Sequence, residues 1–282
     1  MHTAESLLSV DNAEDYAVSH GHSLYNPLLE ETINLKLLSY NIQSGIETYK
    51  YRHYLTRSWR HVFPNAERQQ NLQQISELIN EYDIVALQEV DAGSLRSRFV
   101  NQTEYLAEQA YFPHWYDLTN RNLGMLAQQS IGLLSRVKCS QVMEHKLPGF
   151  IPGRGALMVH LGNDSNPLLL VTLHLALGRR ARRRQLQYVA DIVKEYQYAI
   201  VMGDMNCVAD SHEMTILEDR AGLQQPDDSN LYTFPSWRPF RNIDQILVTP
   251  NISVRDVSVL NYPLSDHLPL SMDIELPRSI IQ

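Results

Sequence analysis

Residues 168–206 read LLLVTLHLALGRRARRRQLQYVADIVKEYQYAIVMGDMN. The segment begins with an apolar run that predicts a buried strand over 168–175, and it ends with a second run that predicts a strand over 199–202. Between the two runs, apolar residues recur at helical spacing and predict a helix over 182–196. The segment therefore predicts strands that alternate with amphipathic helices, which is typical of an α/β protein.

The same alternation extends to both sides of this segment. Further strands are expected over 35–41, 84–88, 130–135, 156–161, 245–249, 253–260 and 270–275. Further helices are expected over 67–82 and from about residue 101. No linker rich in Gly, Ser or Pro interrupts residues 31–282, so we expect a single domain there. Residues 1–30 show neither apolar period and are expected to be a partly ordered leader.

The composition is typical of a globular protein, since 44% of the residues are hydrophobic and 20% are charged. The formal net charge of -8 argues against a protein that coats nucleic acid through its overall field. The two cysteines, Cys139 and Cys207, form no CxxC pair, so we expect neither a disulfide framework nor a structural zinc site. The acidic amino terminus lacks a signal sequence, and the apolar runs are too short to cross a bilayer, which together predict a cytoplasmic protein.

Residues suited to acid–base or metal chemistry stand at the ends of the predicted strands. They lie in the segments LLSYNIQ, DIVALQEVD, LVTLHLALG, AIVMGDMN, NIDQIL and LSDHLPL. Because a sheet delivers the ends of its strands to a shared rim, we expect these side chains to form one distributed site.

Glu89 follows a strand that is predicted to be buried, where an ionised carboxylate is costly unless it is paired or bound to a metal ion. Mg²⁺ prefers oxygen ligands and uses one or two carboxylates. This preference suits Glu89 and Asp266, with help from the neutral Asn41 or Gln43. The alternative is a carboxylate at a strand end that water solvates.

Asp204 and Asn206 are two residues apart, so on an extended segment both side chains leave the same face and reach one target. A carboxylate beside a carboxamide is suited to orient an attacking water and to hold a phosphoryl oxygen. The alternative is an Asx turn, because the sequence Gly-Asp-x-Asn is rich in turn formers.

Asp266 and His267 are adjacent, so a turn after Pro263 is needed to bring both toward the site. Asp244 is then the natural partner to orient His267, which suits a general acid or base, or an imidazolium that binds a transition state. The alternative for His267 is an ordinary surface histidine. His174 ends an apolar strand and is either a site residue or a satisfied core histidine.

Two segments are candidates for substrate binding. Arg179, Arg180 and Arg182 belong to an arginine-rich run that suits bidentate phosphate contacts, unless these arginines pair with acidic neighbours. In TFPSWRPFRNID, a lip that stacks a base or enters lipid headgroups is expected from Trp237, Arg238, Phe240 and Arg241, with plain loop packing as the alternative.

In this order, the segments LSYNIQ, ALQEVD, VTLHL, GDMN, NIDQIL and SDHLP resemble the motifs of the endonuclease/exonuclease/phosphatase superfamily, which includes DNase I. The resemblance runs from about Leu35 to Glu275. It implies a four-layer α/β sandwich, in which two packed and mainly antiparallel sheets are flanked by helices. It also implies that a phosphate ester is hydrolysed by in-line attack of water, with Mg²⁺ or Mn²⁺ and without a covalent intermediate.

By this resemblance, Glu89 is the expected principal metal ligand, Asp266 assists it, and Asn41 orients the phosphate or a metal-bound water. Gln43 stands where AP endonucleases carry an acidic residue, so a tightly held second metal ion is not expected.

The resemblance assigns the remaining residues to the attacking water and the phosphate. Asp204 is expected to align or deprotonate the water, and Asn206 to hold a non-bridging oxygen. His174 is expected to hydrogen-bond the phosphate, while Asp244 and His267 form a pair.

Family members often supply a tyrosine or arginine from a middle loop, for which Tyr116, Arg121 and Asn122 are candidates. The basic and aromatic segment over 46–64 is expected either to wall the substrate groove or to cover a sheet edge.

The substrate class stays open. The local arginines slightly favour a nuclease, whereas the acidic net charge and the aromatic lip favour an esterase of phospholipids, sphingomyelin or inositol phosphates. A catalytically inactive module that binds phosphate is the third hypothesis. The chain is expected to be a monomer whose partner is its phosphate-ester substrate.

Overall fold

The computed structural model describes residues 31–45, 66–122, 128–149, 154–162, 165–226 and 230–281. The predicted leader over 1–30 and the basic, aromatic segment over 46–64 lie outside the described residues. Residues Glu31–Gln282 group into one compact unit.

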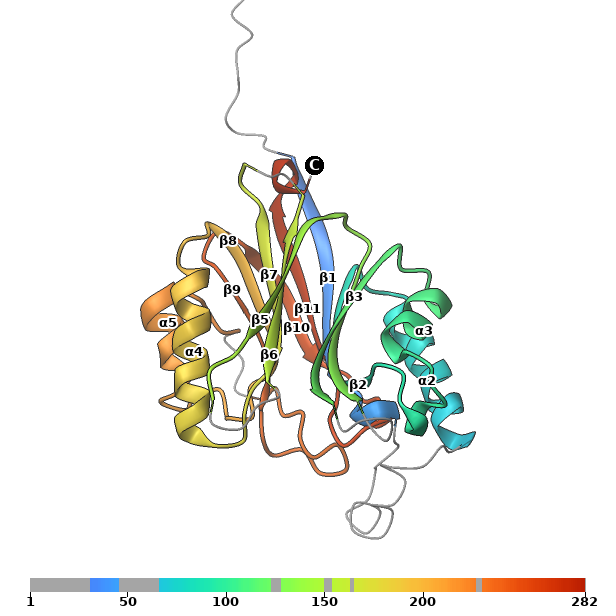
Figure 1. Cartoon of the computed structure of the whole chain (residues 1–282). Coiled ribbons are helices and arrows are strands. Elements are labelled where there is room, and N and C mark those ends of the chain that lie inside the picture. Colours follow the sequence, from blue (N-terminus) through green and yellow to red (C-terminus); the bar gives the residue numbers. More distant parts are fainter. Residues whose placement is uncertain are drawn as a thin grey trace, which may run out of the picture. The chain divides into compact units, whose positions relative to one another are not determined.

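Two mixed β-sheets lie face to face at the centre of this unit (Figure 1). The six-stranded sheet has the order β10-β11-β1-β2-β4-β3. Its strands are β1 (Thr32–Asn41), β2 (Ile84–Asp91), β3 (His114–Asn122), β4 (Gln128–Ser135), β10 (Ser253–Val259) and β11 (Leu270–Pro277). The five-stranded sheet has the order β5-β6-β7-β8-β9. Its strands are β5 (Cys139–Lys146), β6 (Gly155–Leu161), β7 (Leu168–His174), β8 (Tyr198–Asp204) and β9 (Asp244–Val248).

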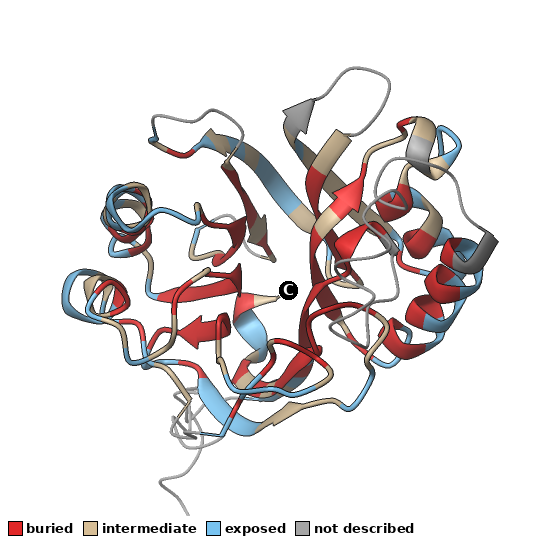
Figure 2. Ribbon diagram, turned by 90° about the horizontal axis from the view of Figure 1, so that it is seen from below, coloured by how far each residue is buried: buried red, intermediate tan, exposed pale blue. Residues whose placement is uncertain are grey.

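Helices cover the outer face of each sheet (Figures 1 and 2). The six-stranded sheet carries α2 (Ala66–Ile79) and α3 (Gln102–Gln109), and the five-stranded sheet carries α4 (Arg179–Val193) and α5 (Thr215–Ala221). Short 3-10 helices are η1 (Gln43–Gly45), η3 (Leu95–Ser97) and η4 (Arg278–Ile280). Three buried apolar clusters fill the spaces between the four layers, which confirms the predicted four-layer sandwich.

Strand β1 shows how the side chains divide between these clusters. Leu35 and Leu37 belong to the cluster between the two sheets, whereas Leu38 and Tyr40 belong to the cluster under α2 and α3. Successive side chains of a strand point to opposite faces. Because both faces of the central strands are covered, their sequences are almost continuously apolar.

Each sheet contains one parallel pair of strands, β1 with β2 and β7 with β8, while the other pairs are antiparallel. The carboxyl ends of the two strands in a parallel pair lie at the same edge of their sheet. A hydrogen bond from Asn41 at the end of β1 to Asp204 at the end of β8 brings the two edges together. The lower end of the sandwich in Figure 1 therefore collects side chains from both sheets.

All predicted strands and helices are present, but β3, β5 and α5 were not predicted. Strands β3 and β5 are the edges of their sheets. The sequence of β5, CSQVMEHK, is largely exposed and lacks an apolar run, so the criterion that finds buried strands misses it. Helix α4 begins at Arg179, so the arginine run lies inside the helix. Within the described residues, no helix is both long and apolar enough to cross a membrane.

Candidate active site

Four predicted site residues continue the inward-facing rows of the central strands. Asn41, His174, Asp204 and Asp244 have the same parity as the residues of their strands that fill the cluster between the sheets. The period-2 alternation therefore directs all four side chains into the space between the sheets. All four are buried, and they lie at one end of the sandwich. Figure 2 looks onto this end and shows the two sheets with their helices outside.

Glu89 has the opposite parity, and an irregularity of β2 changes its direction. Strand β2 pairs in register with β4 up to Leu87 and again from Val90, so Gln88 and Glu89 together face one partner residue in a β-bulge. Glu89 has a φ of 57°, a left-handed conformation that costs about 1–2 kcal/mol in a residue other than glycine. Ser44 Oγ donates a hydrogen bond to the carbonyl oxygen of Glu89 over 2.8 Å and holds the bulge.

The bulge brings the carboxylate of Glu89 beside His174. Glu89 Oε1 lies 4.0 Å from His174 Nε2, and 27% of the Glu89 side chain remains exposed. Burial raises the pKa of Glu89, although His267 opposes the rise. Burial also lowers the pKa of His174 well below its ordinary value, and the positive charges of Arg154 and His267 act in the same direction. His174 is therefore a neutral imidazole at physiological pH.

Several site residues meet at Asp204. Asn41 Nδ2 donates to Asp204 Oδ2 over 3.2 Å. The same oxygen lies 3.4 Å from His174 Nε2 and 3.9 Å from His267 Nε2. Burial raises the pKa of Asp204 to about 6, while the positive charge of His267 opposes the rise. A carboxylate with this pKa can accept a proton close to neutral pH.

The chain turns directly after Asp204. Asn206 has a φ of 53°, and its backbone N–H donates to Asp204 Oδ1 over 2.8 Å, so the Asx turn is present and the extended arrangement is wrong. Gly203 has a φ of 143°, and a Cβ there would lie only 2.0 Å from the carbonyl oxygen of Leu173. Asn206 Nδ2 donates to the carbonyl oxygen of Leu175 over 2.9 Å, which leaves its second amide hydrogen for another acceptor.

His267 pairs with Asp244 on the other side of Asp204. His267 Nδ1 lies 2.7 Å from Asp244 Oδ2, and Thr233 Oγ1 donates to the same carboxylate oxygen. Burial acts to lower the pKa of His267, but Asp244, together with Asp204 and Asp266, outweighs burial and raises this pKa to about 10. His267 is therefore an imidazolium held between carboxylates at neutral pH.

The segment after Pro263 folds so that Asp266 and His267 both enter the site, where they are buried. Ser236 fastens this segment, because its backbone N–H donates to the carbonyl oxygen of Asp266 over 2.8 Å and its hydroxyl to that of Ser265 over 2.6 Å. Ser265 Oγ in turn donates to the carbonyl oxygen of Asn41 over 2.6 Å.

The described site contains a group of oxygen donors that suits a hard divalent cation. Gln43 Nε2 donates to Asp266 Oδ2 over 3.2 Å, and Asn41 Oδ1 accepts from the backbone N–H of Gln43 over 3.1 Å. Burial raises the pKa of Asp266 to about 6, and the negative charge of Glu89 adds to the rise. The buried carboxylate of Asp266 and the partly exposed carboxylate of Glu89 repel each other beside neutral amides, so a cation between them is stabilising. Mg²⁺ and Mn²⁺ prefer such oxygen ligands.

A second group consists of Asp204, Asp244 and His267, whose ligand atoms all lie within 4.8 Å of one another. Here, however, His267 Nδ1 is already bonded to Asp244, and the raised pKa of His267 keeps its ring protonated. A protonated imidazole offers no lone pair to a metal ion. The donor set around Glu89 and Asp266 therefore fits a cation better.

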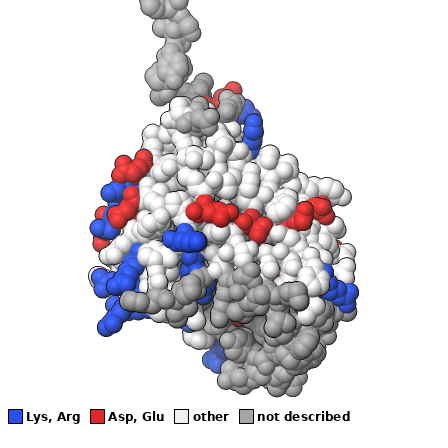
Figure 3. All heavy atoms as spheres, in the orientation of Figure 1, with Lys and Arg blue, Asp and Glu red and all other residues white. Residues whose placement is uncertain are grey.

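The predicted substrate-binding arginines divide into two kinds. Arg182 is only 12% exposed, and it bonds to the buried Glu213 over 2.8 Å and to the carbonyl oxygens of Ala176 and Leu177. Arg179 Nε lies 3.4 Å from the same carboxylate. Arg179 and Arg182 therefore follow the alternative to phosphate binding, in which an arginine pairs with an acidic neighbour. Arg180 is exposed, and basic side chains gather at the lower left of Figure 3, beside the start of α4.

Phe234, in the segment that carries the predicted lip, lies next to His267. The centroid of the Phe234 ring is 4.9 Å from the centroid of the His267 imidazole. The guanidinium of Arg241 lies over the Phe234 ring, 5.9 Å from its centroid. Trp237 is half-buried, and Arg238 is exposed. Phe234 thus lies beside the site, whereas the partial burial of Trp237 agrees with the alternative of loop packing.

The residues that contribute to the site and were not predicted include Thr233, Ser265 and Arg154. Thr233 and Ser265 are ordinary hydroxyl residues whose contacts depend on loops that only the folded chain defines. Arg154 precedes β6 and interacts electrostatically with Glu89 and His174. The sequence signal for Arg154 is a cationic residue directly before the strand that was predicted over 156–161.

The middle-loop candidates are not all described. Tyr116 lies in β3, is partly buried against the cluster between the sheets and interacts with Cys139. The side chains of Arg121 and Asn122 lie outside the described residues.

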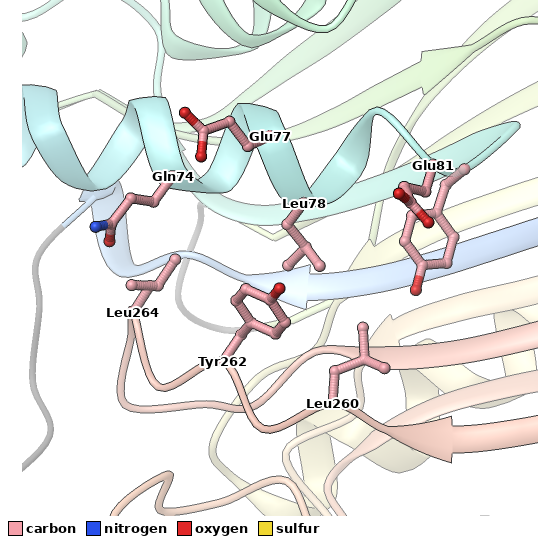
Figure 4. A pocket seen from close by; sticks show the side chains of 8 residues that line it. Gln74, Glu77, Leu78, Glu81, Leu260, Tyr262 and Leu264 are labelled. Atoms are coloured by element: carbon pink, nitrogen blue, oxygen red, sulfur yellow. The ribbon is translucent and has the colours of Figure 1, made fainter.

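Pockets on the described surface include the two that follow. One of about 610 Å³ lies between α2 and the loop after β10, where Leu78 faces Tyr262 and Leu260 (Figure 4). It contains none of the predicted site residues. The other, of about 470 Å³, is lined by Arg154.

A family model described as the endonuclease/exonuclease/phosphatase family matches residues 38–267. No curated protein sequence matches the chain.

Several solved structures share the fold. A family protein from Bacteroides thetaiotaomicron has a TM-score of 0.68 at 17% identity, with 87% of this chain and 99% of that chain covered. A mannosyl-6-phosphatase from the same species has a TM-score of 0.62 at 17% identity, with 85% and 99% covered. The human Nocturnin catalytic domain, with bound sulfate, has a TM-score of 0.63 at 18% identity, with 86% and 96% covered. At these identities the likeness concerns the fold.

Proposed function

Because the chain belongs to the endonuclease/exonuclease/phosphatase family, whose members are hydrolases of phosphoester bonds and typically depend on a divalent metal ion, we propose that it hydrolyses a phosphate ester by in-line attack of water. The observation that carries the proposal is the convergence of Asn41, His174 and His267 on one carboxylate oxygen of Asp204.

Asp204 is the proposed general base. Its raised pKa of about 6 makes it a better proton acceptor than an ordinary aspartate. The hydrogen bonds from Asn41 Nδ2 and from the backbone N–H of Asn206 fix its orientation. Because the carboxylate is already oriented, the attack of water does not include the entropic cost of ordering it.

His267 is the proposed charge partner of the transition state. Asp244 binds Nδ1 and keeps the ring protonated, so Nε2–H is left to donate toward the site. A phosphoryl group in transit accumulates negative charge on its oxygens, and a fixed imidazolium stabilises that charge. Neutral His174 and the second amide hydrogen of Asn206 are further donors for non-bridging oxygens.

Glu89 and Asp266 are the proposed ligands of Mg²⁺ or Mn²⁺. A cation bound there supplies positive charge to a phosphoryl oxygen. Asn41 or Gln43 was predicted to assist the metal. Gln43 orients the carboxylate of Asp266 through its hydrogen bond to Oδ2, whereas Asn41 Oδ1 accepts from the Gln43 backbone and keeps a second lone pair.

The substrate class divides between a nuclease and an esterase of small or lipid phosphates. The nuclease hypothesis rested on the arginine run, and it loses support because Arg179 and Arg182 bond to Glu213. The aromatic ring of Phe234 beside His267 fits either class, since an aromatic side chain can stack a base or enter a headgroup layer.

The test is metal-dependent turnover on a panel of substrates. Purified protein is incubated with Mg²⁺, Mn²⁺ or a chelator and with p-nitrophenyl phosphate, plasmid DNA, RNA, sphingomyelin and inositol phosphates. We expect at least one ester to be consumed only when metal is present, and Asp204→Asn to abolish this turnover. The matched control is Asp256→Asn, which removes an exposed carboxylate in β10.

An inactive module that binds phosphate is the competing hypothesis. It is disfavoured because the described site retains every predicted acid, base and amide. Phosphate binding to the wild type, with no turnover of any ester in the panel, would establish it instead.

A further inference from the structure

A cavity of about 470 Å³ lies where the edge strands of the two sheets approach each other. Strand β3 contributes Thr119 and Asn120 to its lining, and the β5–β6 hairpin contributes Glu144, Lys146 and Arg154. The volume falls within the range of about 300–1,000 Å³ that is usual for small-molecule sites.

The strand register places this cavity next to the candidate active site. Ala156 of β6 pairs with Leu173 of β7, so Arg154 lies two residues beyond this pair, beside the end of β7 at His174. Arg154 also acts electrostatically on both Glu89 and His174. Arg154 thus belongs to the lining of the cavity and to the surroundings of the proposed metal ligand.

Local backbone features shape the cavity. The pairing of β3 with β4 shifts between Thr119 and Arg121, and this bulge leaves Asn120 out of the ladder. Gly155 allows β3 to come close to β6, because a Cβ at Gly155 would lie 2.5 Å from Asn120 Oδ1 and 2.7 Å from Leu118 Cδ2. The two strands that pair with β4 are therefore both bulged near the same end of β4. The bulge in β2 redirects Glu89, and the bulge in β3 redirects Asn120.

The chemistry of the lining limits what can bind. Lys146 and Arg154 supply two cations against one carboxylate, Glu144. Thr119 and Asn120 supply a hydroxyl and an amide, which can bond to hydroxyl groups. None of the described lining residues is Phe, Tyr or Trp, so only His145 and Arg154 offer flat faces on which a nucleobase could stack.

We propose that this cavity holds the alcohol part of the substrate, and that this part is a small polyhydroxylated molecule with a second phosphate besides the scissile one. Arg154 stands between the two phosphates, Lys146 binds the second one, and Asn120 bonds to the hydroxyl groups. The assignment rests on the proposed function, because it names the substrate class of that same site.

The experiment compares kcat/KM for four probes in the presence of Mg²⁺: glucose 1,6-bisphosphate, glucose 6-phosphate, p-nitrophenyl phosphate and a single-stranded oligonucleotide. The wild type should prefer the bisphosphate over the monophosphate. Lys146→Ala should reduce this preference about tenfold, mainly through KM, because a charge-assisted contact is worth about 1.5–3 kcal/mol and 1.4 kcal/mol corresponds to tenfold. Asn120→Ala should lower the ratio of kcat/KM for glucose 6-phosphate to that for p-nitrophenyl phosphate.

Lys138→Ala is the matched control, because Lys138 is exposed at the opposite end of the same hairpin. It should leave both ratios unchanged, and the melting temperatures of all variants check that they fold. The inference is overturned if Lys146→Ala keeps the wild-type preference, or if the oligonucleotide is the best of the four probes. Failure of the proposed function looks different, since none of the four probes, p-nitrophenyl phosphate included, would then be hydrolysed in a metal-dependent way.

Discussion

Asn41 Nδ2 donates a hydrogen bond to Asp204 Oδ2 over 3.2 Å, although the two residues are 163 positions apart and belong to different sheets. Each residue ends a central strand, and each continues the row of side chains that fills the cluster between the sheets. The relative position of the proposed base and its neighbours is therefore set by the packing of the two sheets. Close-packed interiors change little under thermal motion, which suits a site that needs fixed geometry.

The buried acids predict how the stability of the metal-free protein depends on pH. The pKa values of Asp204 and Asp266 are each about 6, above the ordinary aspartate value of 3.8. Each carboxyl group therefore contributes stability that is fully present below pH 3.8 and is lost as the pH rises through 6. The pKa of His267, about 10 against an ordinary 6.5, gives a contribution that is complete below 6.5 and is lost as the pH rises through 10. With a chelator present, the melting temperature should therefore fall between pH 5 and pH 9.

Asp204→Asn isolates the part of this effect that one carboxylate causes. At pH 7.5 the metal-free variant should be more stable than the wild type by up to about 3 kcal/mol, because a shift of one pKa unit corresponds to about 1.4 kcal/mol. Chemical denaturation at several pH values measures the difference. Asp256→Asn, at an exposed position, should show no such gain. A metal-free Asp204→Asn protein that is less stable than the wild type at pH 7.5 would contradict the raised pKa.

Glu89→Gln should remove most of the stabilisation that a divalent cation gives. A ligand present at 100 times its dissociation constant stabilises the native state by about 2.7 kcal/mol, so Mg²⁺ or Mn²⁺ should raise the melting temperature of the wild type. The glutamine keeps the size of the side chain but lacks the charge that attracts the cation. Differential scanning calorimetry with and without chelator measures both shifts.

The control for this prediction is Glu108→Gln, which neutralises an exposed carboxylate in α3. It should respond to Mg²⁺ as the wild type does. An equal metal-induced shift in Glu89→Gln would show that the cation binds elsewhere, with Asp204, Asp244 and His267 as the next set to test.

Asp244→Asn should lower the pKa of His267 and reduce turnover together. Asp244 makes the largest contribution that raises this pKa, both through its charge and through its hydrogen bond to Nδ1. A neutral imidazole no longer stabilises the charge of the transition state, and we expect kcat to fall by about 10²–10⁴, the usual range for such groups. NMR titration of the His267 ring and steady-state kinetics measure the two effects.

Asp219→Asn, at an exposed position in α5, is the comparison for Asp244→Asn. A fall in kcat without a change in the pKa of His267 would mean that Asp244 acts on the reaction by another route.

The sequence predicts the family, the four-layer fold and most of the central strands, because buried strands have recognisable apolar runs. It also predicts that polar residues at the ends of those runs share one end of the sandwich. The alternation of side chains along β2 places Glu89 on the face turned away from the other sheet, so its position in the site does not follow from alternation. The β-bulge that redirects Glu89 is a backbone irregularity for which the sequence has no signal that we recognised. Asn206 was wrongly expected on an extended segment for a similar reason, since the strand stops at Asp204.

Edge strands and loop contacts were harder to predict. Strand β5 pairs on one side only and is largely exposed, so it needs few apolar residues. The role of Arg154 depends on the hairpin that β5 forms with β6, and without β5 that arginine has no expected neighbour. The contacts of Thr233 and Ser265 likewise depend on loops whose course alternation does not describe.

Arg182→Ala should destabilise the fold far more than it affects turnover. Its guanidinium is bonded to Glu213, which is 5% exposed, and to carbonyl oxygens of the loop between β7 and α4. Removal of one member of a buried ion pair costs about 3–5 kcal/mol when the other charge is left unpaired. The exposed Arg179, 3.4 Å from Glu213, compensates for part of this loss. Arg183→Ala, at an exposed position in the same helix, should cost less than about 0.5 kcal/mol. If Arg182→Ala instead kept wild-type stability and raised KM for a phosphate ester, the arginine would be a substrate ligand, and the support for a nuclease would return.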